Sequence, residues 1–220
     1  MAAMIAGLAV EADAEAVVVR AESPLRAVSS AIVGGGVAEV RSIVNLHVPR
    51  GFRCDEGERR LDEFVTARSL ARPYVGLLTG AATERAEQAL AHHDGVTAWV
   101  AVTLGLSNRV TAGLSPAVAW RPSTINTIVV VDAEPEDAAL VNLVITATEV
   151  KTLALAAADV RAAGGTLASG TSTDAIVIAA TGRGPRCRFG GPASELGSLV
   201  ARAVKSATEV SVARWMAERR

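Results

Sequence analysis

Aromatic side chains are scarce in this sequence, at 3% of its 220 residues. Single-stranded nucleic acids are bound largely by stacking of bases on aromatic rings, so this scarcity argues against such a platform. The net charge is -1 and no long basic run occurs, which also argues against an electrostatic nucleic-acid surface. We therefore expect no nucleic-acid partner.

Cysteine is also rare: Cys54 and Cys187 stand alone, without CxxC spacing. This pattern excludes the common structural zinc sites and implies no disulfide framework, which favours a reducing compartment. The apolar start, residues 1–10, lacks the basic segment of a signal peptide. No apolar run approaches the roughly 20 residues of a membrane span. We therefore expect a cytoplasmic protein with no membrane partner.

Half of the chain is hydrophobic, mostly aliphatic, which suits one globular domain over residues 1–220. The central part of the chain, residues 122–180, is predicted to form a strand, a helix and a second strand. Residues 123–132 are a β-branched run that predicts a buried strand. A helix should begin near Glu134 with acidic residues and a proline, and end near Gly164. Residues 174–180 form a second apolar strand.

The remaining pattern alternates strands and helices only loosely, with several strands adjacent in sequence. We predict strands at 15–21, 26–32, 43–48, 74–79 and 95–106, and helices at 55–72, 82–92 and 192–215. This order indicates an α/β domain with a mixed sheet and packed helices, although an α+β arrangement also fits. The alternative is a pair of stacked sheets between helix layers.

The long central helix places Asn142, Thr146 and Glu149 on one polar stripe at 100° per residue. Lys151 lies on the opposite, apolar arc. Either its ammonium reaches solvent at the edge of the core, or it is buried with a partner. Glu149 and Lys151 therefore cannot meet at one point.

Three other segments contain polar residues or glycines, and each has two possible interpretations. Alternation in residues 43–48 puts Asn45 and His47 on one strand face, which is either solvated or lines a pocket. The glycines at 34–36 make either a plain turn or a close approach to a ligand. The hydroxyl residues at 171–173 either cap a turn or take part in chemistry.

Several segments, taken together and in order, carry a family resemblance. They are Ser29-Ser-Ala-Ile-Val-Gly-Gly-Gly36, Asn45-Leu-His-Val48, Thr103-Leu-Gly-Leu-Ser-Asn108, Thr124-Ile-Asn-Thr-Ile-Val129, Ile145-Thr-Ala-Thr-Glu-Val-Lys151, Gly170-Thr-Ser-Thr-Asp-Ala175 and Gly191-Pro-Ala-Ser-Glu-Leu-Gly197. The sequence resembles the adenosylcobinamide amidohydrolases over roughly residues 25–210. Phe189 stands where the family often has Tyr, and Ser194 where it often has Thr.

The resemblance implies hydrolysis of the amide that joins the aminopropanol arm to the corrin ring, giving adenosylcobyric acid. A corrinoid is then the substrate, cobalt enters with it, and no further cofactor is required. A homo-oligomer is compatible with this expectation. The alternatives are a corrinoid-binding protein without catalysis and an amidase acting on small amides.

Amide hydrolysis needs a nucleophile, a base and a donor for the oxyanion. Glu149 could activate water beside Asn142 and Thr146. A hydroxyl of residues 171–173 could attack, helped by Asp174 or His47. A metal held by Glu149, His47 and Asp174 could activate water, although no HExxH or GxSxG motif is present.

The predicted catalytic residues are thus Glu149, His47, Ser172 and Asp174. An amide-fringed corrinoid would suit a shallow cleft of amide and hydroxyl side chains with close backbone approach. The predicted substrate-binding residues are Gly34, Gly35, Gly36, Asn45, Asn108, Thr124, Asn126, Asn142, Thr146, Thr171 and Thr173.

Overall fold

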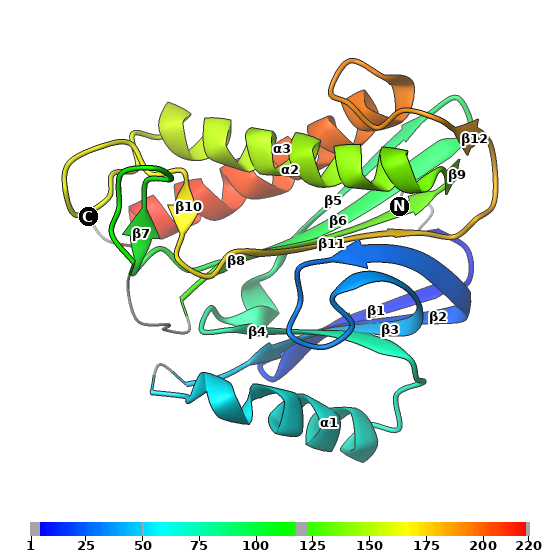
Figure 1. Ribbon diagram of the computed structural model, residues 1–220, viewed down its shortest axis with the longest axis horizontal. Helices are drawn as coiled ribbons and strands as arrows, with labels where there is room; N and C mark the ends of the chain where they lie inside the picture. Colours follow the sequence, from blue (N-terminus) through cyan, green and yellow to red (C-terminus); the bar gives the residue numbers. More distant parts are fainter. Residues whose placement is uncertain (1–4, 50, 118–122, 219–220) are drawn as a thin grey trace.

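The computed structural model describes residues 5–49, 51–117 and 123–218. Eight strands form one mixed sheet in the order β4-β3-β2-β11-β8-β6-β5, with β1 paired to β2 (Figure 1). The sheet strands are β1 (Leu8–Ala12), β2 (Ala16–Ser29), β3 (Gly36–His47), β4 (Tyr74–Thr79), β5 (Glu87–His93), β6 (Val96–Leu104), β8 (Ile125–Asp132) and β11 (Ala175–Ala180). The helices are α1 (Gly57–Ala67), α2 (Asp137–Ala157) and α3 (Glu195–Ala217).

Short elements complete the chain. The strand pairs β7 (Arg109–Val110) with β10 (Gly170–Thr171), and β9 (Glu134–Pro135) with β12 (Arg186–Cys187), lie outside the main sheet. The 3-10 turns are η1 (Cys54–Glu56) and η2 (Thr83–Arg85). The β7–β10 pair brings the loop after β6 against the segment before β11, and this contact helps to build the candidate site.

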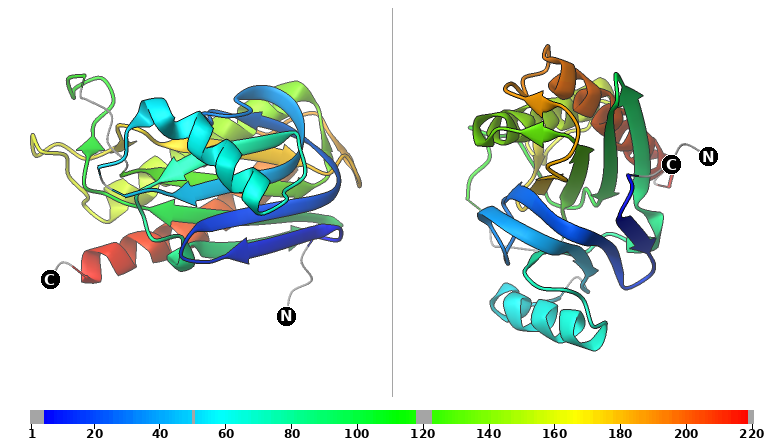
Figure 2. Two further views of the ribbon diagram at one scale, coloured as in Figure 1. Left: turned by 90° about the horizontal axis from the view of Figure 1, so that it is seen from below. Right: turned by 90° about the vertical axis from the view of Figure 1, so that its right-hand side faces the viewer.

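The long strand β2 is the place where the sheet folds over on itself. Residues 17–21 of β2 pair with β1, whereas residues 26–29 pair with β11. Between Arg20 and Leu25 the pairing with β3 shifts register, as at a β-bulge. A bulge bends and twists a strand, so one continuous sheet can stack its two halves face to face (Figure 2).

Three apolar cores hold the layers together. Side chains such as Ile43 on β3 and Ile128 on β8 fill the space between the two sheet halves. Leu61 and Phe64 of α1 cover the outer face of β3 and β4. Leu143 of α2 and α3 residues cover the outer face of the other half. The order of layers is therefore helix, sheet, sheet, helices (Figures 1 and 2).

The predicted α/β class with a mixed sheet and packed helices is confirmed. The alternative was two stacked sheets between helix layers. The structure has one sheet, and its two halves stack in this way. The two strands predicted at 15–21 and 26–32 are one strand, β2, bent at its bulge. The central strand, helix and strand are all present, and the helix is shorter than predicted, at Asp137–Ala157.

The helix predicted at 82–92 is wrong. Residues 87–93 form strand β5, which pairs antiparallel with β6. The turn between them is Asp94-Gly95, and both residues have positive φ, 46° and 78°. Asp-Gly is a preferred two-residue hairpin turn, so sheet pairing overrides the helix-favouring alanine and glutamate content.

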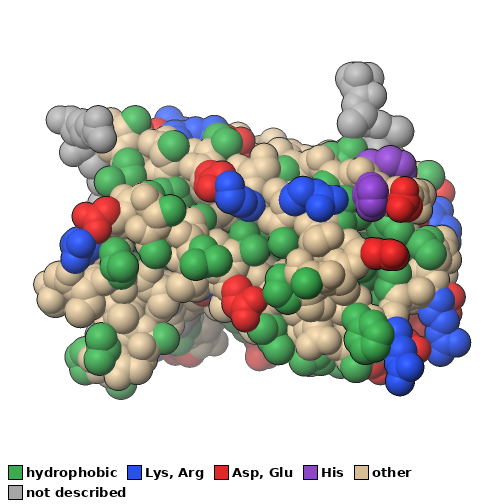
Figure 3. Space-filling model, turned by 90° about the horizontal axis from the view of Figure 1, so that it is seen from above, with side chains coloured by type: hydrophobic (Ala, Val, Ile, Leu, Met, Phe, Trp, Pro, Cys, Tyr) green, Lys and Arg blue, Asp and Glu red, His purple; other side chains and the backbone are tan. Residues whose placement is uncertain are grey.

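Among the helices of the described chain, α2 is long and apolar enough to cross a membrane, judged by length and composition alone. The expectation that no apolar run approaches that length was therefore wrong. A helix packed in a core meets the same test, and α2 packs against the sheet and α3. On the outer face formed by these helices, hydrophobic side chains are interspersed with polar and charged ones (Figure 3).

Candidate active site

The turn before β11 is organised around the carboxylate of Asp174. Its Oδ1 accepts hydrogen bonds from the backbone amide of Ile125 at 3.0 Å and from Thr171 Oγ1 at 2.5 Å. Its Oδ2 accepts from the Thr171 amide at 3.1 Å and from Lys151 Nζ at 2.5 Å. Two donors on each oxygen use the lone pairs of this carboxylate, so it is suited to holding the turn rather than to abstracting a proton.

The helical pattern allows Lys151 either to reach solvent or to be buried with a partner, and the structure shows that it is buried with Asp174. Its side chain is 12% exposed and that of Asp174 is 18% exposed. Gly170 closes over the ion pair, since a Cβ added there would lie 2.1 Å from Asp174 Oδ2 and 2.7 Å from Lys151 Nζ. Lys151 is absent from the predicted site residues, and a charged side chain on an apolar helix arc was the signal that pointed to it.

A cleft of about 220 Å³ opens beside this turn. One wall is apolar, with Leu77 and Leu78 of β4 and Ile32 of the loop after β2. The other wall carries polar side chains, namely Thr124, Ser172, Thr173 and Asp174. Two segments of the resemblance, around residues 124 and 170–175, thus meet at one place.

The hydroxyl groups near the cleft differ in the acceptors of their hydrogen bonds. Thr171 donates to Asp174, and Thr124 donates to the Thr173 carbonyl at 2.6 Å. Ser172 Oγ instead accepts from Asn108 Nδ2 at 2.8 Å. Among the described residues, none accepts the hydrogen of the Ser172 hydroxyl.

Asn45 and Asn126 lie in the space between the two sheet halves, both 1% exposed, and neither lines the cleft. Asn126 Nδ2 donates to Asn45 Oδ1 at 2.8 Å and to the Leu78 carbonyl at 2.9 Å. Asn45 Nδ2 donates to Thr103 Oγ1 at 2.9 Å. These amides bond to the protein, and Asn126 holds the backbone of Leu78, which lines the cleft. Their role in substrate binding stays a prediction.

His47 lies at the end of β3 and is not part of the cleft lining. Its Nδ1 is 2.9 Å from the carbonyl oxygen of Ala81. A carbonyl can only accept, so this contact places the hydrogen on Nδ1 and leaves Nε2 as an acceptor in the neutral ring. Its catalytic role stays a prediction.

The polar stripe of α2 does not face the cleft. Glu149 is exposed, and it has no polar partner among the described side chains. Thr146 is fully buried, and its hydroxyl donates to the Gly190 carbonyl at 2.9 Å on another side of the helix. Asn142 is half-buried. The sheet lies under the Lys151 side of α2, so the hypothesis that Glu149 converges with His47 and Asp174 is not supported by this geometry.

The glycines at 34–36 shape the loop that carries Ile32 to the cleft, but they do not line the cleft. Gly34 has φ of 70°, and a Cβ there would lie 2.6 Å from the Tyr74 carbonyl oxygen. The arrangement is that of a tight turn packed on β4. Within residues 5–49, 51–117 and 123–218, no three His, Cys, Asp or Glu side chains gather as a metal site would require.

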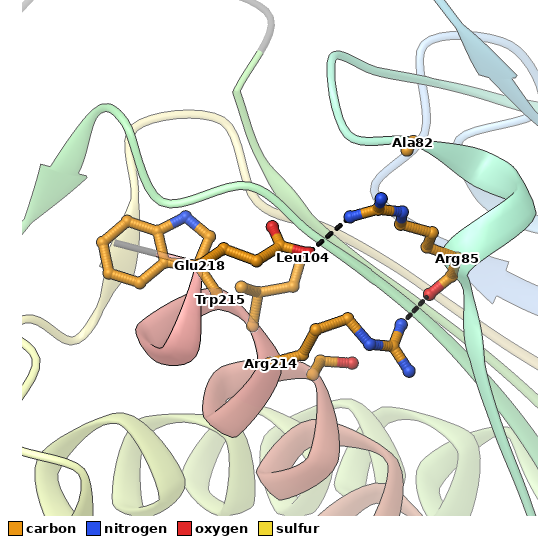
Figure 4. Close-up of a pocket in the computed structure, with 7 residues that line it drawn as sticks. Ala82, Arg85, Leu104, Arg214, Trp215 and Glu218 are labelled. Carbon is orange, nitrogen blue, oxygen red and sulfur yellow. Dashed lines mark hydrogen bonds and ion pairs between the residues drawn. The ribbon is translucent and has the colours of Figure 1, made fainter. Parts of the chain in front are cut away.

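A second cavity, of about 100 Å³, lies between α3 and η2 (Figure 4). Arg85 pairs with Glu218, and Arg214 donates to the Arg85 carbonyl at 2.9 Å and pairs with Glu87. Each guanidinium thus faces a carboxylate. The cavity is therefore a poor anion site and fits a structural joint between α3 and the η2 segment.

Comparison with known proteins identifies the family of the chain. The family model described as adenosylcobinamide amidohydrolase matches residues 1–220. The chain belongs to the adenosylcobinamide amidohydrolase family. The family resemblance seen in the sequence is thereby confirmed, and the chain is an amidohydrolase, a hydrolase of carbon–nitrogen amide bonds.

Two curated relatives carry the family name. The adenosylcobinamide amidohydrolase of Methanosarcina mazei is 32% identical over 185 residues, 78% of this chain and 82% of its own. That of Halobacterium salinarum is 33% identical over 191 residues, 81% of this chain and 76% of its own. The solved PH0078 protein from Pyrococcus horikoshii shares the fold at a TM-score of 0.50 and 14% identity, over 94% of this chain and 79% of that one.

Proposed function

We propose that this member of the family hydrolyses the amide between the aminopropanol arm and the corrin ring of adenosylcobinamide. The products are adenosylcobyric acid and aminopropanol. Family membership supports the reaction, and the cleft supports its location. The observation that carries the location is that Ser172 lines the cleft with a hydroxyl hydrogen that no described residue accepts.

The cleft matches the arm better than the ring. At about 220 Å³ it is smaller than the roughly 300–1,000 Å³ of pockets that enclose drug-sized ligands. The arm is small, with a methyl group for the apolar wall and a hydroxyl and amide for the polar wall. The ring then remains outside, against the mouth of the cleft where Ile32 is 40% exposed.

Ser172 is the proposed nucleophile. Its Oγ adds to the amide carbon, the carbon–nitrogen bond breaks, and the hydroxyl proton ends on the departing amine. Water then hydrolyses the resulting ester, releases the carboxylic acid and restores the serine. Asn108 orients the Ser172 oxygen through its 2.8 Å hydrogen bond.

The test is incubation of the purified protein with adenosylcobinamide, with and without a chelator, followed by mass analysis of the products. The proposal expects aminopropanol and adenosylcobyric acid in equal amounts in both samples. Absence of both products, with cobinamide still bound, would instead fit a corrinoid-binding protein without catalysis. Hydrolysis of simple amides but not of adenosylcobinamide would favour a general amidase.

A further inference from the structure

We infer that the Lys151–Asp174 ion pair is the positioning device of the reaction: it holds the turn at 170–174 so that Ser172 faces the cleft. This inference rests on the proposed function. Lys151 belongs to α2, and Asp174 lies directly before β11. The pair therefore ties the layer of helices to the loop that carries the nucleophile.

The contacts of the turn show what the pair adds. Asp174 receives the Ile125 amide from the start of β8 and the Thr171 amide and hydroxyl from its own turn. These bonds fix the turn to the sheet. Lys151 is the charged contact that fixes it to α2, and it bonds to the same oxygen, Oδ2, that receives the Thr171 amide.

The surroundings permit little movement of the pair. Both side chains are mostly buried, and the Gly170 position leaves no room for a Cβ beside them. Removing one partner of a buried ion pair leaves the other charge uncompensated, which favours rearrangement towards water. Asp174 would then turn away from Thr171, and the backbone that carries Ser172 would follow.

A displacement of the nucleophile affects the rate of reaction more than the binding of substrate. A misplacement of about 1 Å can lower turnover by roughly 100-fold. Lys151 itself does not line the cleft, so its loss removes no contact with substrate. The pair should therefore act on kcat and leave KM nearly unchanged.

The experiment compares Lys151→Met with Thr152→Val. Thr152 is the neighbouring α2 residue, and its hydroxyl donates to the Ser169 carbonyl at 3.1 Å, so its loss also removes a helix-to-loop bond without touching Asp174. We expect Lys151→Met to lower kcat by about 100-fold with KM within about threefold. Thr152→Val should keep both constants within about threefold. A kcat of Lys151→Met equal to that of Thr152→Val would overturn the inference.

A double variant separates positioning from folding. Lys151→Met with Asp174→Asn removes both charges, but the Asn amide nitrogen cannot accept the Thr171 amide hydrogen that Asp174 Oδ2 accepts, so thermal stability should recover only in part relative to the single variant while kcat stays low. Recovery of kcat together with stability would show that the pair serves folding alone.

Hydrogen exchange gives a readout that needs no substrate. The Thr171 amide should exchange at least about tenfold faster in Lys151→Met than in the wild type, while the amide of Val129, in the core of β8, stays unchanged. Equal Thr171 exchange in the two proteins would overturn the inference. If the wild type releases no aminopropanol, the proposed function fails, and the exchange comparison still decides the role of the ion pair.

Discussion

Asn126 on β8 donates a 2.8 Å hydrogen bond to Asn45 on β3, across the space between the two halves of the folded sheet. The second hydrogen of the same amide group goes to the Leu78 carbonyl of β4. One side chain therefore joins three strands that are far apart in sequence. Leu78 also lines the cleft, so this contact holds the backbone of one lining residue.

Asn126→Ala should destabilise the protein by about 2–4 kcal/mol, because two buried acceptors, Asn45 Oδ1 and the Leu78 carbonyl, lose their donor. Denaturant unfolding measures this cost. Asn142→Ala, on the half-buried face of α2, is the control, with an expected change within about 0.5 kcal/mol. Equal costs for the two variants would show that the bridge between the sheet halves adds no stability.

Gly170→Ala should destabilise the fold by about 1–3 kcal/mol and lower turnover, because the new methyl group would press on Asp174 Oδ2. Gly164→Ala is the matched control, since a Cβ there meets nothing within 4 Å. Thermal unfolding and turnover of both variants check the prediction. A Gly170→Ala protein as stable and active as Gly164→Ala would mean that the ion pair is free to shift.

Glu149→Gln should retain turnover within about twofold of the wild type. The carboxylate is exposed on the side of α2 away from Lys151, so its charge does not act at the cleft. The measurement is the rate of aminopropanol release under saturating adenosylcobinamide. A large loss of kcat with binding intact would restore the hypothesis that Glu149 activates water.

Ile32→Ser should raise KM for adenosylcobinamide by about fivefold, because the ring loses an apolar contact at the cleft mouth. The same change should leave KM unaltered for N-(2-hydroxypropyl)propionamide, which carries the arm and its amide without the ring. Val37→Ser is the control, since Val37 is similarly exposed, at 50%, but does not line the cleft. Parallel rises for both substrates would place the ring elsewhere.

Much of the fold could be predicted because β-branched runs identify buried strands without knowledge of their partners. Residues 125–132 and 175–180 are such runs, and both form strands of the sheet. Strand β5 could not be identified in this way, since its residues favour a helix and only pairing with β6 makes it a strand. The bend of β2 likewise depends on its two different neighbours, β1 and β11.

The site could be predicted in part for a related reason. Amide, hydroxyl and carboxylate chemistry predicts Asn108, Thr124, Ser172, Thr173 and Asp174 as site residues, and the structure brings them together around the cleft. A helical pattern gives the angle between Glu149 and Lys151, but it does not say which of them faces the sheet. In the folded structure the Lys151 side of α2 faces the sheet, where Lys151 bonds to Asp174. The cytoplasmic location, the lack of a cofactor requirement and the oligomeric state stay predictions.

The most direct measurement is the kcat of Ser172→Ala with adenosylcobinamide, in a variant shown to bind cobinamide and to unfold at the wild-type temperature. Our account predicts a loss of about 1,000-fold, because the attacking oxygen is gone while the cleft is intact. Turnover of Ser172→Ala within about tenfold of the wild type would contradict it, since the amide would then be cleaved without this hydroxyl.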